Sequence, residues 1–260
     1  MLGVNHATSG AAAWIALTGA MPLLTTGAYP LDPIGVLAGA TVCAGAALLP
    51  DADHHGATIS RAVPVLGRLT AEVVETVSGG HRHGAHSLLA AVLVAAGASA
   101  LGLATLDVDG LGAVAVGAGI GTTALTAFGV KARGFVRSWW AAWALGFALG
   151  MCIVVFAPEQ FGWFPLAVTL GFLAHLAGDL LTTGGLPGLF WPWVPRPPEF
   201  VADLPVVNQV WRPNGFVALP ILGDTGSWRE RALGAVLALY AAVGTTAELI
   251  RWAWPHLHLG

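Results

Sequence analysis

Long stretches of the chain carry no charged residue, and these stretches predict the helices. Segments free of Asp, Glu, Lys and Arg are the ranges 1–31, 33–50, 83–106, 110–130, 138–158, 160–178 and 232–247. Most of them are close to the roughly 20 residues that a helix needs to cross a bilayer. We therefore expect seven transmembrane helices, the last one extended to about 231–252.

Three features refine this pattern. The first segment lacks a basic n-region and continues past the length of a signal peptide, so we expect a retained helix with a kink at Pro22. In the last segment Glu248 would have to face the bundle or the membrane interface. An aromatic belt is predicted near the span ends, formed by Trp139, Trp140, Trp163, Trp191, Trp193, Trp252 and Trp254.

Composition supports a membrane protein. The chain is 56% hydrophobic and 10% charged, whereas an ordinary soluble domain is about 25% charged. The net charge of -3 provides no basic field for direct nucleic acid binding. Cys43 and Cys152 lie in apolar stretches and are interpreted as packing residues. The predicted fold class is an all-α polytopic membrane helix bundle, with residues 1–260 forming a single integral membrane domain.

Two polar segments interrupt the spans and orient the bundle. Residues 51–82 form an amphipathic segment, and residues 184–230 form a Pro/Trp-rich loop. If seven helices alternate, both segments share one side with the N-terminus, and every basic residue except Arg251 lies on that side. The positive-inside rule makes this side cytoplasmic. We expect the Pro/Trp-rich loop to lie beside the functional site as a lid or as a lip for lipid entry.

Histidines and aspartates gather in four short segments. These are Asn5-His6, residues 50–55, residues 81–87, and His175 with Asp179. In the alternating topology all four segments lie at the cytoplasmic end of the bundle. His175 and Asp179 are four residues apart on one helical face, where a cation can bridge them.

This residue set predicts a metal site. The candidate ligands are His6, Asp51, Asp53, His54, His81, His86, His175 and Asp179. Mixed imidazole and carboxylate ligands without thiolates suit zinc, with manganese or iron as alternatives, and the number of ligands fits two or more ions. Metal-activated water, with Arg82 holding negative charge, fits hydrolysis of a phosphoester. We assign catalytic roles to Asp51, Asp53 and Arg82, and leave the identity of the general base open.

Each motif also has a purely structural interpretation. His175 and Asp179 are equally well explained as satisfied packing residues of a helix. Residues 51–54 can be a solvated helix end with capping carboxylates, and Arg82 with its flanking histidines can be a basic anchor next to the membrane. His256 and His258 resemble a polar tail and are excluded from the site.

The motifs, taken in order, resemble the YdjM-like family of bacterial inner-membrane proteins, the DUF457 group. The matching stretches are Asn5-His6, Pro50 to His54, His81 to Ser87, His175 to Gly185 and Trp191-Pro192. Asn5 stands where Thr is common, and Ala85 replaces the Thr before His86. The resemblance implies a metal-dependent hydrolase of the bacterial inner membrane, and the family is also described as LexA-binding, which implies a regulatory protein partner.

A looser likeness to bacterial zinc-dependent phospholipase C, which cannot be matched residue by residue, favours phosphoester chemistry. With the site at the lipid boundary, the expected substrate is a phospholipid or another lipid-linked phosphate. Three alternatives stay open: a metal transporter or sensor, a regulatory protein that binds a partner through residues 184–230, and a haem-binding cytochrome. A transporter would need polar residues through the membrane, and helices 4 and 5 offer only Thr122, Thr123 and Thr126.

Overall fold

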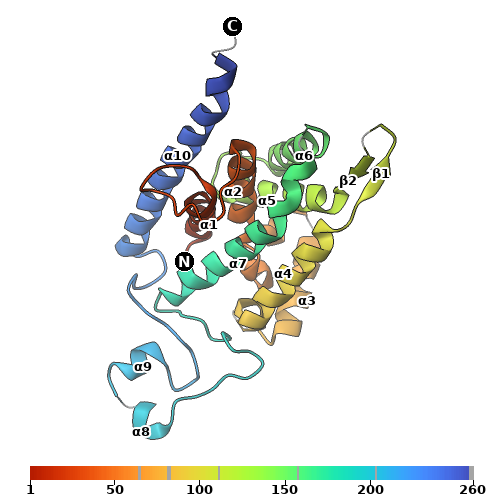
Figure 1. Cartoon of the computed structure of the whole chain (residues 1–260). Helices are drawn as coiled ribbons and strands as arrows, with labels where there is room; N and C mark the ends of the chain where they lie inside the picture. The colour runs from red at the N-terminus through yellow and green to blue at the C-terminus, as the bar shows by residue number, and fades with distance from the viewer. Residues whose placement is uncertain (64–65, 81–82, 111, 157, 203, 258–260) are drawn as a thin grey trace.

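The computed structural model describes residues 1–63, 66–80, 83–110, 112–156, 158–202 and 204–257. Helices dominate it (Figure 1). The elements are α1 (Gly3–Thr18), α2 (Pro33–Ala46), η1 (Pro50–Asp53), η2 (Ile59–Arg61), α3 (Leu66–Ser78), η3 (Gly84–His86), α4 (Leu88–Gly102), β1 (Leu106–Val108), β2 (Gly112–Val114), α5 (Val116–Ala132), α6 (Trp139–Phe156), η4 (Pro158–Trp163), α7 (Phe164–Leu180), α8 (Glu199–Ala202), α9 (Val207–Val210) and α10 (Trp228–Leu257). The η elements are short 3₁₀ helices.

Each of the seven predicted segments overlaps one long helix, namely α1, α2, α4, α5, α6, α7 or α10. Among the described residues, the stretches long and apolar enough to cross a membrane are Pro33–Asp53, Trp139–Phe156, Phe161–Leu180 and Trp228–Trp254. Residues Leu88–Gly102 form a shorter apolar helix. The helical membrane fold is therefore confirmed, and the count of seven spans stays a prediction.

The prediction of an all-α fold was incomplete, because a small antiparallel hairpin joins α4 to α5. Its strands pair Leu106 with Val114, so the helices stop short of the predicted boundaries at 106 and 110. Gly110 and Gly112 have φ angles of 82° and 74°, a conformation that favours glycine and allows the chain to reverse here. The hairpin lies at the edge of the bundle opposite α10 (Figure 1).

The first helix also differs from the prediction. It ends at Thr18 and does not continue through a kink at Pro22. The next loop folds back on the helix end, where the amides of Thr26, Tyr29 and Leu31 donate to the last carbonyls of α1 at 2.8–3.1 Å. These bonds replace a further helical turn, which Pro22 could not complete because it lacks an N–H group.

Helix α2 forms the centre of the bundle and contacts α1, α5, α7 and α10. Glycines allow two of these helices to approach its backbone closely. A Cβ atom on Gly10 of α1 would lie 2.5 Å from the carbonyl oxygen of Cys43, and one on Gly171 of α7 would lie 2.4 Å from the same atom. Small residues at such crossings permit close packing of membrane helices. The helices that carry His6 and His175 are thereby held against α2, which leads to Asp51 in η1.

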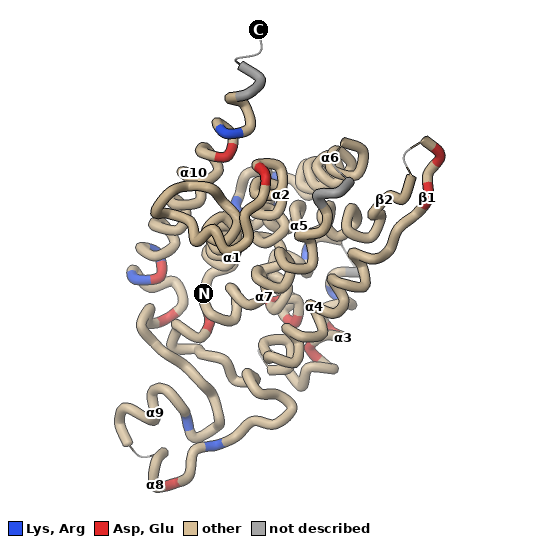
Figure 2. Tube along the Cα trace, viewed as in Figure 1, with Lys and Arg blue, Asp and Glu red and all other residues tan. Residues whose placement is uncertain are grey.

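The outer helices carry an apolar surface that suits lipid. Trp140 and Phe147 on α6 are 87% and 60% exposed, and α4 and α10 also expose large hydrophobic side chains. Helices α4 and α6 carry no charged residue (Figure 2). Exposed apolar surface of this extent indicates contact with a membrane.

Polar and aromatic residues near the helix ends follow the predictions in part. Glu248 faces the bundle, where its Oε1 accepts a hydrogen bond from the amide of Ala20 at 3.0 Å. The prediction that Trp163 belongs to an aromatic belt was wrong. It is 2% exposed and packs against Trp14 at a ring separation of 5.8 Å, because its segment turns into the core.

Candidate metal centre

Four segments that are distant in sequence bring histidines and aspartates together at one end of the bundle. His6 lies in the first turns of α1, Asp51 in η1 after α2, His86 in η3 before α4, and His175 with Asp179 near the end of α7. The side chains of His6, His86, His175 and Asp179 are fully buried, and that of Asp51 is 23% exposed. Asp51 is therefore the member of the cluster that solvent reaches.

His175 lies at the centre of this cluster. Its Nδ1 is 2.8 Å from the carbonyl oxygen of Ala47, and because a carbonyl can only accept, Nδ1 carries the proton. Nε2 is then the ring nitrogen left to bind a metal ion. That atom lies 3.2 Å from Nε2 of His86, 3.6 Å from Oδ2 of Asp179 and 3.8 Å from Oδ1 of Asp51. A backbone carbonyl that orients a histidine in this way is typical of metal-ligating histidines.

His6 completes the cluster from the side of α1. Its ring stacks on that of His175 with centroids 3.7 Å apart, and its Nε2 lies 3.2 Å from Oδ1 of Asp179. Neither ring nitrogen of His6 makes a hydrogen bond within the described residues. The terminal amine of Met1 also donates to Oδ1 of Asp179. Gly178 makes room for the stack, since a Cβ atom there would lie 3.2 Å from the His6 ring.

The arrangement fits a divalent metal ion. Two groups of three residues each bring their ligand atoms within 4.8 Å of one another. One group is His6, His175 and Asp179, and the other is Asp51, His86 and His175. Buried polar atoms without hydrogen bonds are costly, and a bound metal ion would satisfy one of the two nitrogens of His6. Imidazole nitrogens and carboxylate oxygens suit zinc, manganese or iron. Both groups include His175, whose Nε2 can ligate only one ion. The cluster can therefore hold one ion with His175, and a second ion only through the remaining ligands.

Asp53 approaches the opposite edge of His86. Its Oδ2 lies 3.5 Å from Nδ1 of that ring, while Nε2 faces Asp51 and Asp179 at 3.7 Å. Burial alone would lower the pKa of His86, but the carboxylates of Asp51 and Asp53 outweigh it and raise the pKa to about 8. At a pH below this value, metal binding by His86 would release a proton. Asp53 therefore lies behind this ring, where a carboxylate could orient it, and its predicted ligand and catalytic roles stay predictions.

The remaining predicted residues lie elsewhere. His54 is exposed, and its Nδ1 accepts a hydrogen bond from the amide of Gly56 at 3.0 Å. The chain turns outward after η1, so His54 points away from the residues that gather around His175. His81 and Arg82 lie outside the described residues. The assignment of ligands and catalytic residues as a whole stays a prediction.

Sequence reasoning missed Glu230, a fully buried acid at the start of α10. Its Oε1 accepts hydrogen bonds from the Asn5 side chain at 2.6 Å and from the amide of Leu2 at 2.7 Å, and its Oε2 accepts one from Gly226 at 2.7 Å. This explains why Asn fits at position 5. The detectable signal was Ser227-x-x-Glu230, a helix-start pattern, in which the Ser227 hydroxyl accepts from the Glu230 amide at 3.2 Å.

The fold and site define a helical membrane protein with a buried His/Asp cluster that could hold a metal ion. The model of the YdjM inner membrane protein family matches residues 1–131 and 100–254, which together cover nearly the whole chain. The protein therefore belongs to the YdjM inner membrane protein family, as its motifs predicted. None of the curated proteins and none of the solved structures matches this chain.

Proposed function

We propose that the protein is a membrane-embedded metal-dependent hydrolase, a phosphoesterase that acts on a phospholipid or a lipid-linked phosphate at the cytoplasmic membrane face. The observation that carries this proposal is the buried cluster around His175, which four distant segments build from imidazole and carboxylate groups alone. Ionisable groups at such depth are costly unless they are paired or ligated. A function that uses these residues explains why the chain bears that cost.

The residues divide into distinct roles. His6, His175 and Asp179 would hold one ion, and Asp51 and His86 would contribute ligands to a second, with zinc as the proposed metal. When bound, the metal supplies Lewis-acid polarisation of a phosphoryl oxygen and activation of water. Asp51, the partly exposed member, would accept a proton from water that enters the site. Arg82 keeps its proposed role of binding the negative charge of the substrate.

A lipid substrate is supported by the segment that follows α7. The amide of Leu88, the first residue of α4, donates to the carbonyl of Leu189 at 3.0 Å, so this segment lies next to the helix start that follows His86. Farther along, Trp193 and Phe200 are 73% and 80% exposed. Exposed aromatic residues in a segment that contacts the site end of the bundle suit a lip that rests in the membrane interface. Removal of residues 186–200 should therefore reduce turnover of membrane substrates.

The proposal is tested by phosphoester hydrolysis with detergent-purified protein, zinc and mixed micelles of bacterial phospholipids, with products identified by mass spectrometry. We expect His175→Ala to abolish turnover and Asp51→Asn to reduce it strongly. His54→Ala is the matched control, because His54 is exposed and outside the cluster. Equal turnover in wild type and both cluster variants, with all proteins folded, would refute the proposal.

A further inference from the structure

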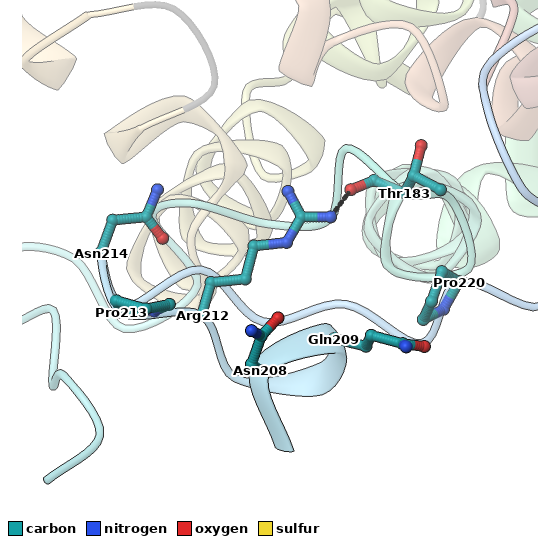
Figure 3. Close-up of a pocket in the computed structure, with 7 residues that line it drawn as sticks. All are labelled: Thr183, Asn208, Gln209, Arg212, Pro213, Asn214 and Pro220. Carbon is teal, nitrogen blue, oxygen red and sulfur yellow. Dashed lines mark hydrogen bonds between the residues drawn. The ribbon is translucent and has the colours of Figure 1, made fainter. Parts of the chain in front are cut away.

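Beyond the cluster, the chain forms a pocket of about 560 Å³ after the end of α7 (Figure 3). Its lining consists of Thr183, Asn208, Gln209, Arg212, Pro213, Asn214 and Pro220. These residues offer one guanidinium group, three carboxamides and one hydroxyl, but no carboxylate. Such a lining suits a ligand with negative charge and several hydroxyl or ester oxygens.

The pocket is attached to the helix that carries His175 and Asp179. Thr183 follows Asp179 by four residues, and its amide donates to the carbonyl of Gly223 at 3.0 Å. The amide of Leu219 donates to the carbonyl of Leu180, the last residue of α7, at 2.6 Å. The amide of Leu222 donates to the carbonyl of Leu181 at 2.9 Å. These bonds hold the pocket wall against the end of α7. A ligand in the pocket is therefore held close to the cluster.

Arg212 is held in place by its backbone. Its amide donates to the carbonyl of Phe216 at 2.9 Å, and its carbonyl accepts from the amide of Gly215 at 2.8 Å. Gly215 has a φ angle of 89°, and a Cβ atom there would lie 2.6 Å from the Val194 side chain, so this tight turn needs glycine.

The charge of Arg212 is available for a ligand. Its Nη2 donates to the carbonyl of Thr183 (Figure 3), and the guanidinium pairs with no carboxylate within the described part of the chain. Asp224 lies nearby but accepts from the Thr183 hydroxyl at 2.5 Å and does not line the pocket. A carbonyl partner leaves the positive charge uncompensated. The other guanidinium N–H groups can therefore serve an anion.

We propose that this pocket binds the anionic, hydroxyl-bearing head of the substrate. Arg212 binds its phosphate or other acidic group, and the carboxamides of Asn208, Gln209 and Asn214 bind neighbouring hydroxyl oxygens. This proposal rests on the hydrolase function proposed above and specifies its substrate class. The same chemistry occurs in a phosphoglycerol lipid headgroup and in a free glycerol phosphate.

The test measures binding without turnover. In the His175→Ala background both ligand groups lose a member, and treatment with a chelator removes residual metal, so anion binding to metal does not contribute. Calorimetry with glycerol 3-phosphate on this detergent-purified full chain should give a saturable signal. Adding Arg212→Gln should weaken affinity by about tenfold or more, as expected for loss of a charged hydrogen bond. Arg196→Gln is the control, since Arg196 is exposed in the same loop and outside the pocket.

Further binding measurements distinguish a lipid headgroup from a free phosphate as the ligand. A preference for phosphatidylglycerol over phosphatidylcholine vesicles that is lost in Arg212→Gln identifies a lipid headgroup, whereas an effect on the soluble probe alone identifies a free phosphate. If Arg212→Gln does not fold, Asn214→Ala should weaken glycerol 3-phosphate more than inorganic phosphate. Equal affinity in the Arg212→Gln and Arg196→Gln proteins would overturn the pocket proposal. Failure of the hydrolase proposal appears separately, as absent metal and absent turnover in the wild-type protein while the chain still binds the probe.

Discussion

At the scale of single residues, His175 organises the centre. The carbonyl of Ala47 fixes which ring nitrogen carries the proton, and the other nitrogen faces His86, Asp51 and Asp179. Asp53 lies at Nδ1 of His86, as the Ala47 carbonyl lies at Nδ1 of His175. The structure thus distinguishes residues that face the centre from residues that orient them, a distinction the sequence motif does not contain.

Asp53→Asn tests this distinction. We expect the variant to bind the same number of metal ions at saturation, but with affinity reduced by about 10–100-fold, as is typical when a partner that orients a histidine ligand is removed. Titration of metal-free protein with zinc measures both quantities, and His54→Asn should match wild type. A smaller number of bound ions would show that Asp53 is itself a ligand. Unchanged zinc affinity would show that Asp53 has no role in metal binding.

At the scale of helices, the crossing at Cys43 positions the site. Gly171→Ala places a methyl group 2.4 Å from the Cys43 carbonyl, so α7 must move away from α2. Overpacking of this kind costs about 1–3 kcal/mol of unfolding free energy. We expect a lower melting temperature and weaker zinc binding.

Gly97→Ala on α4 is the matched control, because a Cβ atom there meets no atom within 4 Å. Melting curves in detergent, recorded with and without zinc, measure the effect. Equal stability and equal zinc affinity in the two alanine variants would contradict the role assigned to this crossing.

Helix positions and the ligand motifs were predictable because both are local in sequence. Charge-free stretches marked the long helices, and the spacing of His175 and Asp179 placed both on one face. The end of α1 was not predictable, since the loop at Thr26 to Leu31 satisfies its carbonyls. Glu230 was missed because its partner Asn5 is 225 positions away. Contacts of this range depend on how the helices pack.

At the scale of the whole molecule, the site end and the hairpin end should face opposite sides of the membrane. His86 precedes α4 and the hairpin follows it. We predict that a membrane-impermeant maleimide labels Asp109→Cys in intact spheroplasts, but labels His54→Cys only after lysis. Both variants need a Cys152→Ala background because Cys152 is exposed. The reverse labelling pattern would place the site on the outer face.

The central claim is that the cluster around His175 holds metal, and elemental analysis of detergent-purified protein tests it most directly. Wild type and the His175→Ala, Asp179→Ala double variant are compared after gentle removal of loosely bound ions. We predict about one or two transition-metal ions per wild-type chain, as the two ligand groups allow, and none in the double variant. Metal-free wild type, with the variant folded normally, would contradict the account.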